Sequence, residues 1–232
     1  IILTGINLGD FGKGYSGGKK HGENFLGLAK ELDMVEGIER FRISSIEPNL
    51  LGNDIIEFVS NSRKFMPHFH IPLQSGSNGI LAAMRRRYRK ELYEEKVGLI
   101  KMMMPHCCIG VDVITGFPGE GEAEFNETVE FLTRLDISYL HVFTYSERDN
   151  THALTLGPVV PVNIRHQRNK ILRTLSYRKM QEFTQRHIGQ TRKVLFEGLN
   201  KNGMMEGYSD NYIRVTVPFR KEWENEIIDW KI

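Results

Sequence analysis

The chain has 232 residues, of which 40% are hydrophobic and 26% charged, and its formal net charge is +2. This length suits one large domain, or one domain with a small appendix. The net charge is too small to indicate a partner, and no apolar run reaches the roughly eighteen residues that a membrane span needs.

The two cysteines, Cys107 and Cys108, are adjacent. This excludes a disulfide framework and favours a reducing, cytoplasmic location. No secretory signal is visible, and the chain opens on an apolar run without an initiator Met. We therefore expect a piece of a longer protein.

Apolar strand-like runs alternate with amphipathic helical segments along most of the chain. The expected strands cover residues 1–4, 41–46, 69–73, 108–114 and 139–145. The expected helices cover residues 24–35, 54–60, 78–84, 90–103 and 122–135. Because this alternation is typical of parallel sheets, we expect an α/β body whose strand ends meet at one rim.

The pattern changes after the fifth strand. Residues 156–162 are rich in Pro, Val and Gly and are typical of a linker, and residues 163–187 predict a long helix. Short strands are expected at 192–197, 204–208 and 212–217, with an Asn-Gly turn at 202–203. The sequence therefore predicts two parts, residues 1–187 and a β-rich appendix, residues 188–232.

Polar residues and one glycine stand at or near the ends of the predicted strands. They are Asn7, Glu47, Gln74, Ser75, Asp112, Gly116 and Arg148. Carboxylates accept from ammonium groups and ribose hydroxyls, an arginine can grip a carboxylate, and a glycine admits close backbone approach. Each residue alone is more simply explained by loop hydrogen bonding. Together at one rim they predict a cofactor-binding site.

Two basic stretches cover residues 85–90 and 165–186. A solvated helix face is the ordinary explanation of such stretches. Phosphate contact combined with base stacking on the appendix is the other, and it predicts RNA binding. The candidate RNA-binding residues are Arg86, Arg87, Lys193, Lys201 and Arg214.

Two weaker patterns predict no site. His68 and His70 alternate along one strand face, but no third metal ligand is evident, so core packing is the simpler use. The glycine-rich residues 11–18 lack the P-loop pattern and are interpreted as a surface loop. We therefore expect no metal site, and no catalytic residue is assigned.

Four motifs together resemble a known family. They are RISSIEP (42–48), HIPLQSGS (70–77), VDVITGFPGE (111–120) and FTYSERDNT (143–151). The chain is identified from them as similar to the radical S-adenosylmethionine methylthiotransferases. It most resembles the branch that methylthiolates threonylcarbamoyladenosine next to the anticodon of tRNA.

The resemblance implies that residues 1–187 form part of a TIM-like (radical SAM) barrel and that residues 188–232 begin a TRAM domain, a small RNA-binding β-barrel. It implies tRNA as partner, a cytoplasmic location, and S-adenosylmethionine and two [4Fe-4S] clusters as cofactors of the intact enzyme. There a 5′-deoxyadenosyl radical would take hydrogen from the adenine ring, and a methylthio group would be added at C2. The oligomeric state stays open.

The sequence departs from the family in its cysteines. The Cys-x-x-x-Cys-x-x-Cys loop and the three further cysteines of the second cluster are absent, and adjacent Cys107 and Cys108 cannot imitate that spacing. We therefore expect no iron in this chain and no activity from it alone. Three alternatives stay open: a fragment that only binds RNA, the sister branch that modifies a ribosomal protein, and an unrelated barrel enzyme using His68 and His70.

Overall fold

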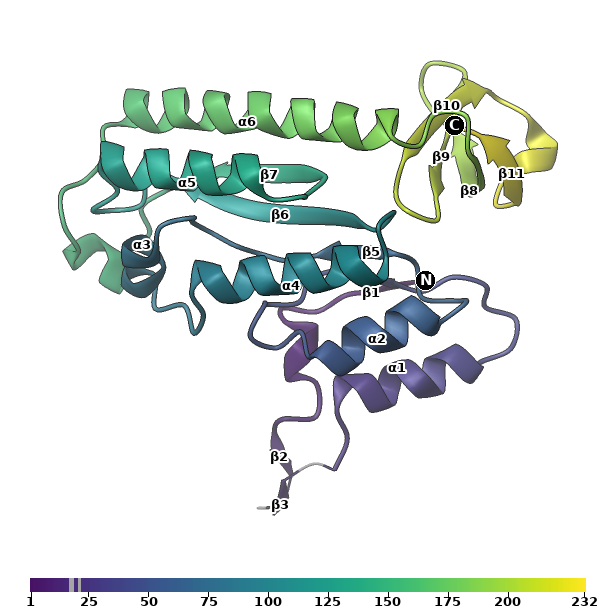
Figure 1. The fold of residues 1–232 in the computed structure, drawn as a ribbon, viewed down its shortest axis with the longest axis horizontal. Helices are drawn as coiled ribbons and strands as arrows, with labels where there is room; N and C mark the ends of the chain where they lie inside the picture. The colour runs from purple at the N-terminus through teal and green to yellow at the C-terminus, as the bar shows by residue number, and fades with distance from the viewer. Residues whose placement is uncertain (17–18, 21) are drawn as a thin grey trace.

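A computed structural model describes residues 1–16, 19–20 and 22–232 of the chain. Parallel strands alternating with helices make up most of it, and an antiparallel sheet follows at the C-terminal end (Figure 1). The mixed α/β content expected from the sequence is confirmed. The partial TIM-like barrel and the TRAM-like barrel stay predictions.

The parallel strands follow one another across the molecule in chain order. They are β1 (Ile2–Leu3), β4 (Arg42–Ile43), β5 (His68–His70), β6 (Cys108–Thr115) and β7 (Tyr139–Thr144). β1 pairs with β4, and β5, β6 and β7 form a three-stranded sheet. The two groups are joined by the backbone, because the N–H of Ile46 donates to the carbonyl of His70 at 3.1 Å.

A helix or a pair of helices follows each parallel strand. They are α1 (Phe25–Met34), α2 (Asn53–Asn61), α3 (Asn78–Ala83), α4 (Lys90–Met103), α5 (Glu122–Arg134) and α6 (Val162–Gln185). In α1 the side chain of Asn24 accepts from Gly27 N–H at 2.9 Å, which satisfies one of the free donors of the first turn. Figure 1 shows α4, α5 and α6 running alongside β6.

Strand alternation divides the side chains of β6 between two faces. Ile109, Val111 and Val113 are fully buried in the main core, which the helices complete with residues such as Tyr93 and Phe131. The alternate residues project from the opposite side. We call that side the open face, and define it by Arg42, His70, Asp112, His141 and Phe143.

Two strands end earlier than expected, at Ile43 instead of 46 and at His70 instead of 73. The pairing beyond His70 nevertheless continues: Ile71 N–H donates to Gly110 O at 2.9 Å and Gln74 N–H to Asp112 O at 2.8 Å. Leu73 N–H also donates to Asp112 O, at 3.2 Å, so the contact with β6 runs past Pro72, which has no N–H to donate.

A short hairpin, β2 (Tyr15–Ser16) and β3 (Lys19–Lys20), occurs in the glycine-rich segment that was expected to be a loop. Gly17 and Gly18 of that segment lie outside the described residues. Three short 3-10 helices were also not expected: η1 (Leu8–Asp10), η2 (His152–Thr155) and η3 (Lys221–Trp223).

The C-terminal sheet has the order β10-β9-β8-β11 and is antiparallel. Its strands are β8 (Thr191–Leu199), β9 (Met204–Ser209), β10 (Arg214–Pro218) and β11 (Ile227–Lys231). β11 was not expected from the sequence and pairs with β8. Phe196 fills the small core of this sheet, between the rings of Trp223 and Trp230.

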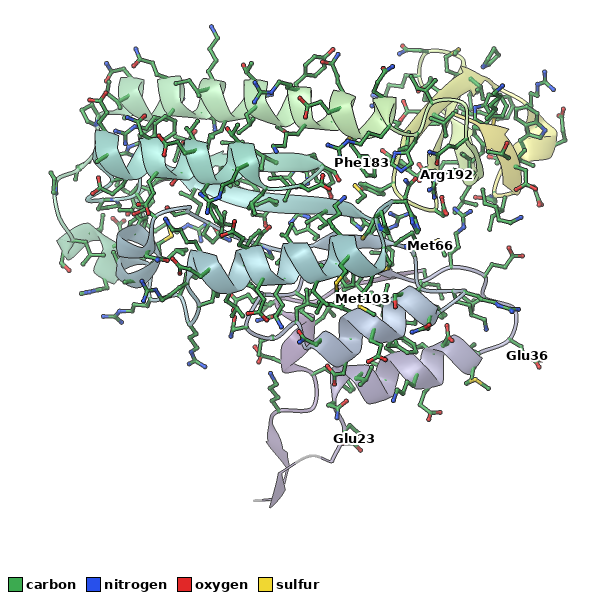
Figure 2. The ribbon with its side chains drawn as sticks, viewed as in Figure 1. Glu23, Glu36, Met66, Met103, Phe183 and Arg192 are labelled. Atoms are coloured by element: carbon green, nitrogen blue, oxygen red, sulfur yellow. The ribbon has the colours of Figure 1, made fainter. Side chains whose placement is uncertain are left out.

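The C-terminal sheet packs against the amino ends of the parallel strands. Asn211 donates to the carbonyl of His106 at 3.1 Å, and Arg42 donates to that of Ser209 at 3.4 Å. Figure 2 shows Phe183, near the end of α6, and Arg192, on β8, close to this junction. Among the described residues, none of the helices has both the length and the apolar character of a membrane span.

Candidate functional site

Three of the residues predicted at the rim follow the ends of neighbouring strands, and the fourth, Asp112, lies inside β6. Asn7 follows β1, and its side-chain oxygen accepts from Glu47 N–H at 3.4 Å after β4. Gln74 follows β5 and is bonded through its N–H to the carbonyl of Asp112 on β6. Consecutive parallel strands therefore carry Asn7, Glu47, Gln74 and Asp112 toward the carboxyl end of the sheet.

Glu47 forms an ion pair with Arg86, and the atoms Oε1 and Nη1 are 2.7 Å apart. Both side chains are about one quarter to one third exposed, so the pair can still be approached. Arg86 Nε is buried and has no hydrogen-bond partner among the described residues. The sequence grouped Arg86 with RNA contacts, whereas the structure puts it beside the cofactor candidate Glu47.

A polar hollow of about 270 Å³ lies next to this pair. Arg85 and the exposed Arg87 line it together with Asp10 and Asn49. Asn49 Oδ1 is buried and unpartnered within the described part of the chain. Glu47 and Arg86 thus present a carboxylate and a guanidinium side by side, the two groups that recognise an ammonium and a carboxylate.

Asp112 has the partner that its place in an apolar strand requires. Its Oδ1 is 2.9 Å from His70 Nε2, and the His70 ring lies 5.3 Å from the ring of His141 on β7. Partial burial lowers the pKa of His141, and His70 acts in the same direction while Asp112 opposes it. The open face therefore carries a row of imidazoles anchored by one carboxylate. The sequence did not predict His141 as part of it.

His68 does not face outward with His70. It is buried, and its Nε2 is 3.0 Å from the hydroxyl of Tyr139. Burial lowers its pKa well below the ordinary value, and the charge of Arg42 adds to this effect. No group of three metal-ligating side chains occurs in the described residues. His68 packs in the interior, and the geometry gives no support to a metal hydrolase built on it.

Gln74 has φ +73°, a left-handed conformation that is uncommon outside glycine. Such a conformation is retained only where the surroundings determine it, and it often marks a ligand site. Here the Gln74 carbonyl accepts from Ile114 N–H at 2.9 Å, which locks the backbone to β6. Its side-chain amide has no partner among the residues that the structure describes, so the amide is available to a ligand.

Ser75 and Gly116 organise loops. The Ser75 hydroxyl is buried, 3.3 Å from Thr128 Oγ1 of α5, and accepts from Ser77 N–H. Gly116 has φ +80°, and a Cβ atom there would lie 2.3 Å from Cγ of Arg165. Neither the Ser75 hydroxyl nor the α-carbon of Gly116 has a free side turned toward a ligand in this structure.

Arg148 is exposed in the loop after β7. Its neighbour Glu147 forms an ion pair with Arg165 of α6, and the hydrogen bonds from that guanidinium lower the pKa of Glu147 to about 2. The sequence did not predict this pair. The two neighbouring charges of this loop therefore have different environments. Glu147 fixes the loop to α6, and Arg148 stays accessible.

Part of the positive charge of α6 is held in the interior of the fold. Arg165 pairs with Glu147, Arg168 pairs with Glu120, and Lys179 donates to two backbone carbonyls, all from buried positions. Three of the cations that the sequence attributed to an RNA-binding helix therefore hold α6 in place.

The RNA candidates on the C-terminal sheet are more exposed. Lys193 lies 3.3 Å from Asp229, Arg214 pairs with Glu206, and Lys201 lies exposed at the turn between β8 and β9. Pairs at such exposed positions contribute little to stability, so these cations can be drawn to phosphate.

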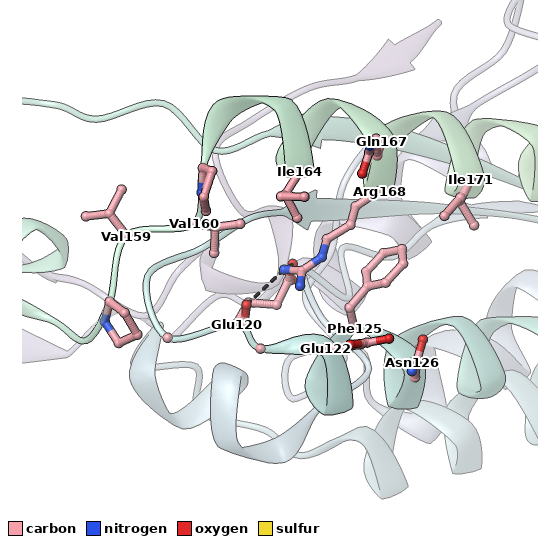
Figure 3. Close-up of a pocket in the computed structure, with 14 residues that line it drawn as sticks. Glu120, Glu122, Phe125, Asn126, Val159, Val160, Ile164, Gln167, Arg168 and Ile171 are labelled. Atoms are coloured by element: carbon pink, nitrogen blue, oxygen red, sulfur yellow. Dashed lines mark hydrogen bonds and ion pairs between the residues drawn. The ribbon is translucent and has the colours of Figure 1, made fainter.

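A largely apolar hollow of about 640 Å³ lies between the first turns of α5 and α6 (Figure 3). A buried ion pair of Glu120 and Arg168, whose Oε1 and Nη1 are 2.7 Å apart, lines it. Burial raises the pKa of Glu120, although the Gly116 N–H and Arg168 oppose this. The hollow lies on the helical side and is separate from the open face.

The residues present differ in how they suit the two kinds of cofactor. Cys107 and Cys108 are fully buried; burial raises the pKa of Cys107, and it raises that of Cys108 to about 12. Because thiolates ligate iron, these cysteines do not fit an iron–sulfur cluster. Glu47 with Arg86, and the amides of Asn7 and Gln74, do fit the amino-acid and sugar groups of S-adenosylmethionine.

Three comparisons with known proteins agree with this fold. Residues 14–132 match the model of the radical SAM superfamily. The chain is 40% identical over 217 residues to a protein of Aquifex aeolicus named threonylcarbamoyladenosine tRNA methylthiotransferase MtaB, covering 93% of this chain and 50% of that one. It is 32% identical over 234 residues to a protein of Lachnoclostridium phytofermentans named tRNA-2-methylthio-N(6)-dimethylallyladenosine synthase, covering 50% of it.

Among solved structures, coproporphyrinogen III oxidase (HemN) from Escherichia coli, a radical SAM enzyme, superposes with a TM-score of 0.50 at 12% identity. It covers 60% of this chain and 32% of that one, and at this identity the likeness concerns the fold alone. The chain spans about half the length of the curated relatives it matches. By its family match over 14–132 and by these relatives, the chain belongs to the radical SAM superfamily.

Proposed function

We propose that this chain is part of a tRNA methylthiotransferase that uses S-adenosylmethionine to modify C2 of threonylcarbamoyladenosine next to the anticodon. The observation that carries the proposal is the 40% identity over 217 residues to a protein of that name. On this proposal residues 1–187 are part of a TIM-like barrel, residues 188–232 are a TRAM-like RNA-binding part, and the enzyme works in the cytoplasm.

S-adenosylmethionine supplies the methyl group and the radical chemistry of such a reaction. In this chain, Glu47 would accept from its ammonium group and Arg86 would donate to its carboxylate. The amides of Asn7 and Gln74 would orient its sugar, and the exposed Arg148 would contact cofactor or substrate. The anchored pair of His70 and Asp112 would form the floor of the site. The clusters would be held by residues outside this chain, since Cys107 and Cys108 do not fit one.

Glu47 and Arg86 give the sharpest test of the cofactor site. In a full-length enzyme that contains this chain, Glu47→Gln or Arg86→Gln should raise the KM for S-adenosylmethionine about tenfold or more, since each removes a charge-assisted hydrogen bond. Glu57→Gln on α2 and Arg63→Gln after it are matched controls, because both side chains are exposed and lie away from the rim. An unchanged KM in both test variants would contradict the assignment.

The nucleoside product tests the substrate. Mass spectrometry of tRNA from cells that make the full-length enzyme should show the 2-methylthio derivative of threonylcarbamoyladenosine. The relative from Lachnoclostridium phytofermentans favours a second candidate, dimethylallyladenosine, which gives a different product. Unmodified tRNA with an altered ribosomal protein would favour the sister branch. RNA binding without any product would favour a binding-only role.

A further inference from the structure

The exposed edge of the parallel sheet carries a groove that none of the preceding assignments uses. A hollow of about 500 Å³ lies between β7 and α6, and a second of about 470 Å³ adjoins it along α6 alone; both are lined by Arg173 and Tyr177. His141 and Phe143 contribute from β7, and His166 and Lys170 from α6. We call these six residues the β7–α6 groove.

The α6 side of the groove follows from helical spacing. Residues 166, 170, 173 and 177 are separated by four, three and four positions, so they lie on one face of the helix. The cations Arg165, Arg168 and Lys179 point elsewhere and are paired in the interior. Within the described part of the chain, Lys170 and Arg173 have no ion-pair partner. The charge that the fold leaves free on α6 is therefore concentrated in the groove.

The groove combines cationic groups with exposed aromatic rings. Tyr177 is 67% exposed and Phe143 53% exposed. No Asp or Glu is among the described residues that line either hollow. Cations without neighbouring carboxylates attract phosphates, and exposed rings stack on nucleobases. This chemistry suits a single-stranded nucleic acid.

An extended peptide is a poorer occupant because the strand edge is already capped. The Ser176 hydroxyl accepts from Leu140 N–H at 2.8 Å and donates to Leu140 O at 2.9 Å. Asn169 donates to Val142 O at 3.2 Å. These bonds occupy three of the backbone groups that a further strand would pair with, which disfavours β-strand addition here.

The groove also leads to the candidate site. His141 lies both in the groove and on the open face, where its ring is 5.3 Å from that of His70, the partner of Asp112. We infer that the β7–α6 groove binds a single-stranded segment of the RNA substrate and guides it onto the open face. Arg173 and Lys170 would contact phosphates, and Tyr177 and Phe143 would stack on bases. The inference rests on the proposed function for the identity of the ligand as RNA.

The test is a titration of a fluorescent single-stranded oligoribonucleotide of about ten nucleotides with the complete 232-residue chain. Arg173→Gln should reduce the slope of log K against log salt by roughly 0.7, the value for one lost phosphate contact to a single strand. Arg178→Gln is the matched control, because this cation is on the same helix, pairs with Glu182 and does not line the groove. Tyr177→Leu should weaken binding about tenfold with the slope unchanged.

A second measurement does not depend on variants. With 4-thiouridine in the RNA, photo-crosslinks should fall in peptides that contain residues 139–143 or 166–180. Crosslinks found only in residues 191–218, or equal effects of Arg173→Gln and Arg178→Gln, would overturn the groove and leave the tRNA modification intact. Absence of RNA binding would also overturn it, while the nucleoside analysis above decides the proposed function separately. Strong protection of the groove from hydrogen exchange in a longer protein without RNA would show a protein segment as its occupant.

Discussion

The ring of Tyr212, just before β10, lies 4.3 Å from the ring of His68, the first residue of β5. The guanidinium carbon of Arg42 lies 4.4 Å from the same Tyr212 ring. Tyr212 has φ +68°, and its neighbour Asn211 is fixed by a hydrogen bond to His106 O. A residue in a strained conformation thus joins the C-terminal sheet to the parallel strands.

The ring of Tyr212 should stabilise the fold through these contacts, whereas its positive φ should destabilise it. Tyr212→Ala should lower the free energy of unfolding by roughly 2–3 kcal/mol, because the half-buried ring and its cation–π contact are lost. Tyr212→Gly should be less harmful by about 1 kcal/mol, because glycine adopts a positive φ freely. Urea denaturation measures both. Equal losses of stability in the two variants would show that the positive φ of Tyr212 costs no free energy. Wild-type stability in both variants would contradict a stabilising contact of the Tyr212 ring with His68 and Arg42.

His68 should make the fold sensitive to acid. Burial lowers its pKa, and Arg42, His70 and His141 act in the same direction. The imidazole therefore binds a proton more weakly in the folded chain than in the unfolded chain. The free energy of unfolding should therefore decrease as the pH drops below about 6.5. The decrease is at most about 1.4 kcal/mol per pH unit for this group.

His68→Gln should flatten that pH dependence in denaturation curves measured from neutral pH downward. Burial also lowers the pKa values of His106, His141 and His187, so part of the slope should remain. The control is His152→Gln, which removes an imidazole from an exposed position and leaves His68 in place. A slope unaffected by His68→Gln would show that this ring does not stay neutral in the fold.

Gly116 and Gly119 form a matched pair in one loop. Both have positive φ, +80° and +85°, but a Cβ on Gly116 would meet Arg165, whereas one on Gly119 meets nothing within 4 Å. Gly119→Ala should cost about 1 kcal/mol from backbone strain alone. Gly116→Ala should cost roughly 1–3 kcal/mol more, since the Arg165 side chain must move. Thermal or urea unfolding gives the comparison, and a similar cost at both positions would show that Arg165 yields freely.

The sequence predicts the repeating part of this fold well, because periodicity is a local property. The helix expected at 90–103 has those bounds, and the strand expected at 108–114 extends by one residue to Thr115. β11 was missed, since Ile227–Lys231 is a strand only through its pairing with β8, which lies some thirty residues earlier. That Asn7, Glu47, Gln74 and Asp112 form a cofactor site stays a prediction; the structure shows contacts between Asn7 and Glu47 and between Gln74 and Asp112.

What the sequence could not give is the direction in which each side chain points. Ser75 and Gln74 are neighbours, yet the hydroxyl of Ser75 turns to Thr128 of α5 while the amide of Gln74 stays free. Arg86 belongs to a basic run but forms an ion pair with Glu47, 39 positions earlier in the sequence. Some cations of α6 lie in the interior because Glu120 and Glu147 are there to pair with them, and others lie in the groove. The positions of these carboxylates are set by the tertiary structure. Such pairings depend on packing across the chain.

Ser176 should protect the edge of the sheet. In Ser176→Ala both backbone groups of Leu140 lose their partner, which should cost about 1–3 kcal/mol and free the β7 edge for pairing with another chain. Thr174→Ala is the control on the same helix, because among the described residues that exposed hydroxyl bonds to Lys170 O and to no group of β7. Urea denaturation and sedimentation measure stability and association. A stable, unassociated Ser176→Ala variant would show that water caps the edge equally well.

The ion pair of Glu120 and Arg168 should behave as a buried pair. Arg168→Met leaves the carboxylate buried without its cation and should cost roughly 3–5 kcal/mol at neutral pH. The loss should shrink near pH 5, because burial already raises the pKa of Glu120 and removal of Arg168 raises it further, so that a neutral carboxyl forms.

The double variant Glu120→Gln with Arg168→Met distinguishes the pair from simple packing. Because neither buried charge remains, it should be more stable than Arg168→Met alone, and the two single losses should not add. Arg178→Met is the control, since that guanidinium is 57% exposed and 3.7 Å from Glu182, and it should change the free energy of unfolding by less than about 1 kcal/mol. Urea denaturation at pH 7 and pH 5 measures the wild type, the single variants Glu120→Gln and Arg168→Met, the double variant and the control. Additive losses, or a loss in Arg168→Met that does not depend on pH, would contradict a charged, coupled pair at the base of the hollow between α5 and α6.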